Sequence, residues 1–412
     1  MAKRRCGKQT PHCLRCRTRG IECSYPPPKP TRFVLCRDDD TPPVVPDVTP
    51  PINWQMCTYS PGLQVSTAEN ARPGFVLDLP GLSSRPVDEQ LASSWFSSLE
   101  TWEIIRPTAD QKLLTVYEMK AYLRKIHRWL SDWVEKGSNP FIHARLYGNR
   151  FPRCIQDAYA SLSCYLHKTP ANEQAVFHII EDRAKQLLAD NGIHSPGSPE
   201  ESKNRRLGPI DPLEHVARVQ ALLVYQTVGL YDGNIRLRSL SESYIPVLEG
   251  WMIEMVQHAK NTVCLGDSVV SPIIEQTDVG PSRLFSALDE DLLWYSWIAA
   301  ESMRRTWVIG SSIQVMFMAL HQGGIPPCQG GMMFTTRQGV WEAQSAVAWE
   351  KLCSEVHVGL MQMADTHRIF TEAAPEDIND FTKVILEVIY GTERIKRWGV
   401  QIDFSDQPCL EF

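Results

Sequence analysis

From about residue 88 onward, apolar side chains recur at the spacing of amphipathic helices. Asp88 can cap a first helix, whose apolar residues follow one another at i, i+4, i+8 and i+11: Leu91, Trp95, Leu99 and Trp102. Thr108 precedes a second segment with apolar residues on one helical face: Leu113, Val116, Tyr117, Leu123, Ile126, Leu130 and Val134. The pattern predicts a helix over each segment.

The same periodicity continues toward the C-terminus, over residues 151–167, 171–191, 211–231, 239–261, 287–321, 338–369 and 375–398. Breaks rich in Gly, Pro and Ser separate these segments, for example at 195–199 and 323–327. Alternating apolar and polar positions are short and rare, and no repeat of fixed period is visible. We therefore expect residues 88–412 to form a large all-α domain and the chain as a whole to be mostly α.

Residues 26–87 have a different pattern, with thirteen prolines and only short aliphatic runs. This composition predicts a Pro-rich disordered linker with polyproline II character. The acidic run Asp38 to Asp40 within it fits either a solvated linker or an acidic interaction patch. We expect the former.

Length and composition narrow the class of protein. The chain has 412 residues, of which 43% are hydrophobic, so it is long enough for two or three folding units. The most apolar stretch, Leu292 to Leu320, is interrupted by Glu301, Arg304 and Arg305, which argues against a transmembrane helix. The N-terminus lacks the apolar core of a secretory signal, so we expect the cysteines to be reduced.

Charge is distributed very unevenly along the chain. Residues 1–37 carry +9 and the remaining 375 residues carry −15, for a net charge of −6. The only acidic residue of this head is Glu22, and its basic residues are Lys3, Arg4, Arg5, Lys8, Arg15, Arg17, Arg19, Lys29, Arg32 and Arg37. A compact basic head on an acidic body points to a polyanionic partner. A solvated basic tail is the alternative from charge alone.

Four of the twelve cysteines lie within 18 residues of this head, in the arrangement Cys6-x6-Cys13-x2-Cys16-x6-Cys23. Thiolates are soft ligands that zinc prefers, and two cysteines separated by two residues can reach one tetrahedral ion from a single turn. We therefore predict that these four cysteines bind metal. The other cysteines are scattered, and we expect them to be buried or neutral thiols.

The segments Arg5 to Cys16 and Gly20 to Pro26 resemble part of the fungal Zn(2)-Cys(6) binuclear cluster, with Pro11 in the middle loop and an aromatic residue, Tyr25, after the last cysteine. The matching region covers about residues 1–25. The linker and the large acidic helical body also resemble these fungal transcription factors. The resemblance implies a zinc-dependent, DNA-binding regulator of RNA polymerase II genes in the nucleus, without enzymatic activity, whose body is a regulatory domain. A metabolic or secondary-metabolite gene set is implied as its target.

The head departs from the family pattern in its number of cysteines. Cys6, Cys13, Cys16 and Cys23 correspond to the third to sixth family cysteines, and the first two would precede Met1. In the family, six thiolates hold two zinc ions, so one ion here lacks a shared ligand and the other keeps two thiolates. His12 or water can serve as a further ligand. We expect a start site upstream of Met1, with a degenerate head as the alternative.

The resemblance also implies roles for the basic residues of the head. Lys3, Arg4 and Arg5 occupy the position from which the family reads bases, and guanine O6 and N7 accept from such side chains in the major groove. The residues suited to contacts with phosphates of double-stranded DNA are Lys8, Arg15, Arg17 and Arg19. Residues 26–87 show no coiled-coil heptad, so a homodimer and contacts with co-regulators or the transcription machinery stay open.

The body contains no catalytic signature that we can identify. The tripeptide Gly266-Asp267-Ser268 is too short to indicate a serine hydrolase. The histidines are mostly isolated, and the tryptophans lie at helical spacings typical of a core. Two alternatives to the DNA-binding regulator remain: a helical regulatory or interaction protein whose truncated head no longer binds DNA, and an enzyme in the body. An effector pocket between helices would fit the regulator, but the sequence does not locate one.

Overall fold

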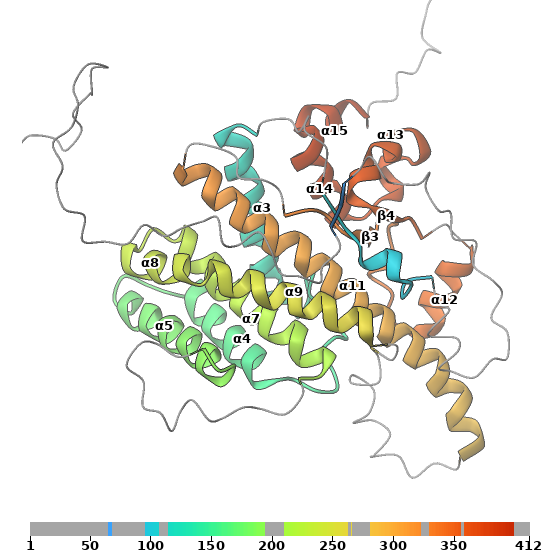
Figure 1. Cartoon of the computed structure of the whole chain (residues 1–412), viewed down its shortest axis with the longest axis horizontal. Coiled ribbons are helices and arrows are strands. Elements are labelled where there is room, and N and C mark those ends of the chain that lie inside the picture. Colours follow the sequence, from blue (N-terminus) through green and yellow to red (C-terminus); the bar gives the residue numbers. More distant parts are fainter. Residues whose placement is uncertain are drawn as a thin grey trace, which may run out of the picture. The chain divides into compact units, whose positions relative to one another are not determined.

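The computed structural model describes residues 65–67, 95–106, 114–193, 210–262, 265, 281–322, 329–355 and 358–398. The chain divides into two compact units, Met1–Met56 and Cys57–Phe412, and all described residues belong to the second. This second unit is mostly helical, which confirms the predicted fold class (Figure 1).

Helix α3 (Val116–Lys136) begins where the sequence supplies a complete capping box. Thr115 Oγ1 accepts the backbone N–H of Glu118 at 3.2 Å, and a Glu118 carboxylate oxygen accepts the backbone N–H of Thr115 at 2.9 Å. The helix ends at Gly137, which has a φ of 77° and so adopts a left-handed conformation that favours glycine. Local sequence therefore defines both ends of α3.

Four helices lie side by side in the order α5 (Glu173–Asp190), α4 (Arg153–Leu166), α7 (Pro212–Tyr231) and α9 (Ile245–Asn261), as Figure 1 shows. Helix α8 (Ile235–Ser243) packs on α7 and joins α9 through Tyr244. Asp211 caps α7 by accepting the backbone N–H of Glu214 at 2.9 Å. Almost every residue of α7 is buried, because α4, α5, α8, α9 and α11 all pack around it.

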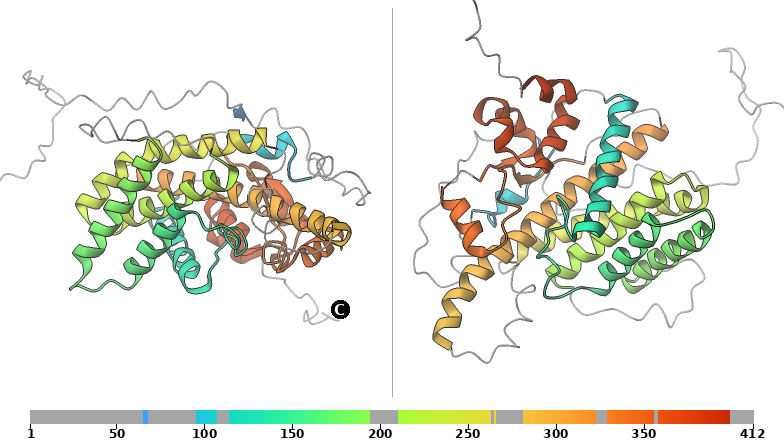
Figure 2. Two further views of the ribbon diagram at one scale, coloured as in Figure 1. Left: turned by 90° about the horizontal axis from the view of Figure 1, so that it is seen from below. Right: turned by 180° about the vertical axis from the view of Figure 1, so that it is seen from behind.

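The 42-residue helix α11 (Pro281–Gln322) connects this group of helices to the C-terminal part of the chain. It packs against α7 and α9, and also against strand β3 (Met333–Thr335) and α12 (Ala346–Glu355). Helix α3 contacts both α11 and α14 (Asp380–Tyr390), as the views in Figure 2 show. Among the described residues, no helix combines the length and the apolar character required to cross a membrane.

The helices enclose a core that is rich in tryptophan. All tryptophans of the described part of the body are buried except the half-buried Trp398, which confirms their predicted core role. Buried polar side chains on α7 and α11 pair with each other rather than interrupting the core. Gln220 donates to Thr306 Oγ1 at 2.9 Å, and Gln314 donates to Gln226 Oε1 at 3.1 Å.

Two short strand pairs add to the predicted all-α body. Strand β1 (Val65–Thr67), in the range predicted as linker, pairs in parallel with β2 (Ile104–Arg106). Strand β3 pairs antiparallel with β4 (Leu360–Gln362), with Phe334 opposite Met361. The remainder of the C-terminal part consists of η4 (Met363–Arg368), α13 (Ile369–Glu372), η5 (Pro375–Asp377) and α15 (Thr392–Trp398).

Two of the predicted helices are wrong. The segment expected as a helix around Trp95 and Trp102 forms a turn and then a short 3-10 helix, η3 (Leu99–Trp102). Among the described residues of the range 338–369, only α12 is an α-helix of more than one turn. Gly339 and Gly359 adopt φ values of 89° and 65°, so the backbone leaves the right-handed helical region on both sides of α12.

Candidate functional site

The predicted metal and DNA-binding residues all lie outside the described residues. These are the metal ligands Cys6, Cys13, Cys16 and Cys23 and the DNA contacts Lys3, Arg4, Arg5, Lys8, Arg15, Arg17 and Arg19. Their roles therefore stay predictions from the sequence.

The described residues contain no group of three or more His, Cys, Asp or Glu that could hold a metal ion. Three cysteines are described: Cys154 is half-buried, Cys164 exposed and Cys353 buried. Burial raises the pKa of the Cys154 and Cys353 thiols to about 12, with Glu214 and Glu350 respectively adding to the effect. Both thiols therefore stay protonated at neutral pH and are poor nucleophiles, as expected for structural cysteines.

The most polar part of the core is a cluster of three charged residues on α11, Glu301, Arg304 and Arg305, which we call the buried charge centre. All three side chains are at most 1% exposed. Arg305 Nε donates to Glu301 Oε1 at 2.8 Å, and Arg304 Nη2 donates to Oε2 at 3.3 Å. These residues appeared in the sequence only as interruptions of an apolar run.

Backbone carbonyls from three segments accept the other guanidinium protons of the buried charge centre. Arg304 donates to Phe96 O at 2.9 Å, and Arg305 donates to Pro140 O at 2.8 Å and to Thr335 O at 3.1 Å. Aromatic rings cover both cations: the Arg305 guanidinium lies 4.1 Å from the ring centroid of Trp341, and that of Arg304 lies 5.0 Å from Trp102.

Electrostatics keep the buried charge centre ionised. Burial by itself would raise the pKa of Glu301, but the guanidiniums of Arg305 and Arg304 outweigh it and hold that pKa below its usual value. Burial lowers the pKa of both arginines from a value far above neutrality, so they remain cations at neutral pH. None of the three residues lines a cavity described below. The arrangement therefore serves to join segments of the fold.

A second polar group lies between α7 and α9. The rings of His215 and His258 stack with their centroids 4.6 Å apart. Arg218 donates to His215 Nδ1 at 3.0 Å and to Glu254 at 2.5 Å. Burial, with Arg218 and His258 adding to it, lowers the pKa of His215 to about 3, so the stacked ring is neutral. The sequence, in which the histidines are mostly isolated, did not indicate this pair, because finding it requires knowing that the two helices are neighbours.

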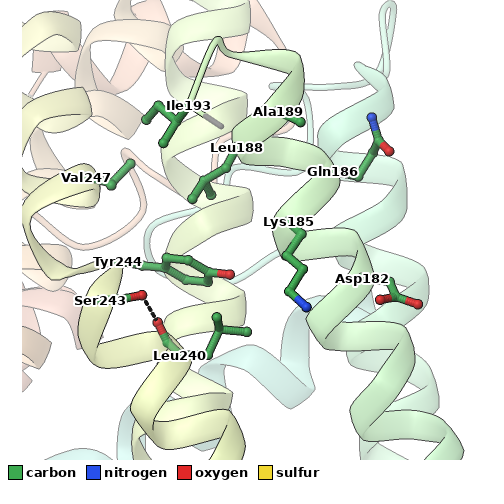
Figure 3. A pocket seen from close by; sticks show the side chains of 10 residues that line it. All are labelled: Asp182, Lys185, Gln186, Leu188, Ala189, Ile193, Leu240, Ser243, Tyr244 and Val247. Carbon is green, nitrogen blue, oxygen red and sulfur yellow. Dashed lines mark hydrogen bonds between the residues drawn. The ribbon is translucent and has the colours of Figure 1, made fainter. Parts of the chain in front are cut away.

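Two of the cavities on the described body have volumes above 400 Å³. The first, of about 550 Å³, lies between α5 and the α8–α9 junction, and we call it the α5–α9 pocket (Figure 3). Its lining residues are Asp182, Lys185, Gln186, Leu188, Ala189, Ile193, Leu240, Ser243, Tyr244 and Val247. The second, of about 430 Å³, lies beside β3, β4 and η4 and is lined by charged residues including Arg337 and Asp377. No sequence motif indicated either cavity.

Comparison with known proteins identifies the head. Residues 1–32 match the family model of the fungal Zn(2)-Cys(6) binuclear cluster domain, which confirms the resemblance predicted from the cysteine spacing. The chain is also similar to transcription factor gsfR2 of Penicillium aethiopicum, with 26% identity over 417 residues. That similarity covers 96% of this chain and 92% of the relative, so it includes the helical body as well as the head. No solved structure matches the chain.

Proposed function

We propose that this chain is a DNA-binding regulator of transcription by RNA polymerase II, of the fungal zinc-cluster type, that acts in the nucleus. The proposal rests on the match of residues 1–32 to the zinc-cluster domain. It is supported by the similarity of most of the chain to a transcription factor. In this proposal, residues 1–25 bind DNA, 26–87 form the linker and 88–412 form the regulatory domain.

Zinc would stabilise the fold of the head. Cys6, Cys13, Cys16 and Cys23 supply four soft sulfur donors, a set that fits zinc better than it fits magnesium or calcium. The free energy of zinc binding is also the free energy of folding in such small modules. The neighbouring arginines favour the thiolate form of the cysteines, since a nearby cation stabilises the negative charge.

The basic residues divide into two groups by the contacts proposed for them. Lys3, Arg4 and Arg5 would donate to base edges in the major groove, which determines sequence preference. The contacts proposed with phosphates set the register on DNA and the dependence on salt, and they come from Lys8, Arg15, Arg17 and Arg19. The acidic body makes the head the part of the chain suited to DNA.

The test compares the full chain with Cys13→Ala, and uses Cys36→Ala, outside the four-cysteine arrangement, as the matched control. We expect the wild type and Cys36→Ala to retain zinc and to bind duplexes selected from a random oligonucleotide library. Cys13→Ala is expected to lose both properties and to keep the helical circular dichroism signal of the body. Zinc-free wild-type protein that binds duplex DNA no better than Cys13→Ala would refute the proposal.

A helical interaction protein that does not bind DNA is the second candidate, and the observation that favours it is the large, mostly helical second unit. If this candidate is right, wild type, Cys13→Ala and Cys36→Ala will show the same lack of zinc and of DNA binding.

A further inference from the structure

The α5–α9 pocket contains a buried hydroxyl group that has no hydrogen-bond partner. Tyr244 connects α8 to α9, and its side chain is 95% buried, with 5% exposed. Its hydroxyl oxygen forms no hydrogen bond in the structure. Figure 3 shows the phenol pointing from the α8–α9 junction into the gap toward Lys185 on α5. An unpaired buried donor costs free energy. A ligand that accepts a hydrogen bond from this hydroxyl would remove that cost, because the described residues supply no acceptor.

The backbone holds Tyr244 firmly in this position. Its N–H donates to Ser241 O at 3.2 Å, and its carbonyl accepts the N–H of Leu248 at 2.9 Å. Burial raises the pKa of the Tyr244 hydroxyl to about 12, and the nearby Glu181 carboxylate adds to this effect. The hydroxyl therefore keeps its proton at neutral pH and can donate a hydrogen bond.

Three polar groups near Tyr244 already have partners. Lys185 Nζ donates to Glu181 at 2.6 Å, and Arg236 donates to the same carboxylate at 2.9 Å. Ser243 Oγ donates to Leu240 O at 2.6 Å, as the dashed line in Figure 3 marks. The lining itself contains one anion, Asp182, and one cation, Lys185. This balance favours a ligand without net charge, because an ion would find no unbalanced charge to compensate its desolvation.

Apart from Gln186, the other lining residues are apolar and come from both sides of the pocket. The apolar side chains on the α5 side are Leu188, Ala189 and Ile193, and those on the α8–α9 side are Leu240 and Val247. The volume of about 550 Å³ is within the range of small-molecule sites. The Lys185 side chain is 47% exposed, so it can turn aside and give a ligand access to the hydroxyl beneath it.

We propose that the α5–α9 pocket binds an uncharged small molecule that has an apolar part and a hydrogen-bond-accepting oxygen, which accepts from the Tyr244 hydroxyl. The apolar part of the molecule lies against Leu188, Ala189 and Val247. This proposal concerns the helical body and does not depend on DNA binding by the head.

The cavity beside β3 and β4 is a weaker candidate. Its charged groups pair with each other: Arg337 with Asp377 at 2.9 Å, and Arg368 with Glu372 at 2.8 Å. Thr336 Oγ1 donates to Gly359 O at 2.8 Å. With these pairs formed, no buried polar side chain of that lining lacks a hydrogen-bond partner, in contrast to Tyr244.

The probe for the test is 6-propionyl-2-dimethylaminonaphthalene, an uncharged aromatic ketone whose fluorescence shifts to the blue in an apolar site. Titrated against the full chain, it is expected to show saturable binding with a blue shift. Ala189→Trp, which fills the pocket, is expected to abolish that binding. Tyr244→Phe is expected to weaken it about fivefold to tenfold, the effect of one lost hydrogen bond. Tyr225→Phe, buried on α7 outside the lining, is the matched control and should bind as wild type does.

A second measurement separates loss of a ligand contact from loss of the fold. Without probe, Tyr244→Phe is expected to unfold at the same temperature as wild type or at a higher one, because it removes an unpaired buried hydroxyl. Cys13→Ala should bind the probe as wild type does, whatever its effect on zinc. The proposal is overturned if wild type shows no saturable binding, or if Tyr244→Phe and Ala189→Trp both bind the probe as tightly as wild type.

Discussion

The backbone N–H of Thr335, at the end of β3, donates a hydrogen bond of 2.8 Å to the carboxylate of Glu301 in the middle of α11. The same carboxylate accepts from Arg305 at 2.8 Å, and Arg305 in turn donates to the carbonyl of Thr335 at 3.1 Å. The loop of three hydrogen bonds joins the C-terminal part of the chain to the long helix. It makes Glu301 the residue on which the packing of both parts depends.

Glu301→Gln keeps the shape of the side chain but leaves two buried guanidiniums without an anion. We expect the free energy of unfolding to fall by about 3–5 kcal/mol, the usual cost of removing one partner from a buried ion pair. Urea denaturation followed by circular dichroism measures it. Glu355→Gln, on the exposed pair with Lys351, is the matched control and should change the value by less than about 1 kcal/mol. Equal effects of the two substitutions would contradict the assigned role.

Stability is expected to fall as the pH drops below about 6.5, in part through His143. Burial, with Arg305 and Arg145 adding to it, lowers the pKa of His143 to about 3, although a hydrogen bond with the Trp341 backbone acts in the opposite direction. Its Nδ1 accepts the backbone N–H of Arg145 at 3.0 Å, a bond that the neutral ring makes. Between pH 6.5 and 3 the unfolded chain binds this proton and the folded chain does not, so acid favours unfolding.

The corresponding variant is His143→Asn, whose side-chain oxygen can accept the same N–H. Urea denaturation at several pH values between 6.5 and 4.5 should show a slope smaller than that of wild type by about 1.4 kcal/mol per pH unit, the value for one proton. Protonation of Glu301 also removes stability, but only at lower pH, because the pKa of this carboxyl is held below its usual value. An unchanged slope in His143→Asn would show that His143 is not the group that titrates.

Helix α7 approaches α8 closely at Gly229, and this contact yields a third prediction. A Cβ atom at this position would clash with the Ser241 side chain and would lie 3.1 Å from the Leu237 carbonyl oxygen. Gly229→Ala should lower the free energy of unfolding by about 1–3 kcal/mol through overpacking. Gly250→Ala, in α9 with nothing within 4 Å of its Cβ, should instead raise it by up to about 1 kcal/mol. Thermal unfolding of both variants measures the difference, and the same sign for both would argue against the close approach.

The proposed phosphate contacts predict a change in salt dependence. Replacing Arg17 with Ala should reduce the slope of the logarithm of the DNA association constant against that of the salt concentration by about 0.9. Affinity should fall by a similar factor for every duplex tested, whereas Arg5→Ala should also reduce discrimination between duplexes. Fluorescence anisotropy at several salt concentrations measures both effects. A steep slope retained in Arg17→Ala would remove this residue from the phosphate contacts.

Local sequence signals were sufficient for most of the long helices. The predicted range 211–231 corresponds to α7 at Pro212–Tyr231, because Asp211 caps the helix and Pro212 fits its first turn. The predicted range 287–321 lies within α11. In the range 375–398, the structure contains α14 and α15 as separate helices, because Gly391 between them has a φ of 86°.

The helix prediction fails where a residue that is distant in the sequence forms a hydrogen bond with a backbone group of the segment. The apolar spacing of Trp95 and Trp102 fits a helix, yet the carbonyl of Phe96 accepts from Arg304, 208 residues away, and from Thr101. In the same way, β3 and β4 pair across the whole of α12. Such long-range contacts leave no periodic pattern in the segments that they join.

The cysteine arrangement of the head and the sites of the helical body also differ in whether their residues lie close together in the sequence. The cysteine arrangement of the head lies within 18 residues of sequence and could be identified from spacing alone. The α5–α9 pocket requires residues from α5, α8 and α9 to be brought together by the fold. The buried charge centre requires α11, strand β3 and the segments of Phe96 and Pro140. Their side chains carry no motif, so only the structure reveals them.

The bond between Arg304 and Phe96 has a consequence for the synthesis of the chain. The acceptor leaves the ribosome 208 residues before the donor. At roughly 5–20 residues per second, this delay lasts on the order of 10 to 40 s. During that time the nascent segment around Phe96 lacks the surface on which it docks, and its apolar rings remain accessible to chaperones. We therefore expect the segment around Phe96, although it is translated first, to be among the last parts of the body to become resistant to protease on the ribosome.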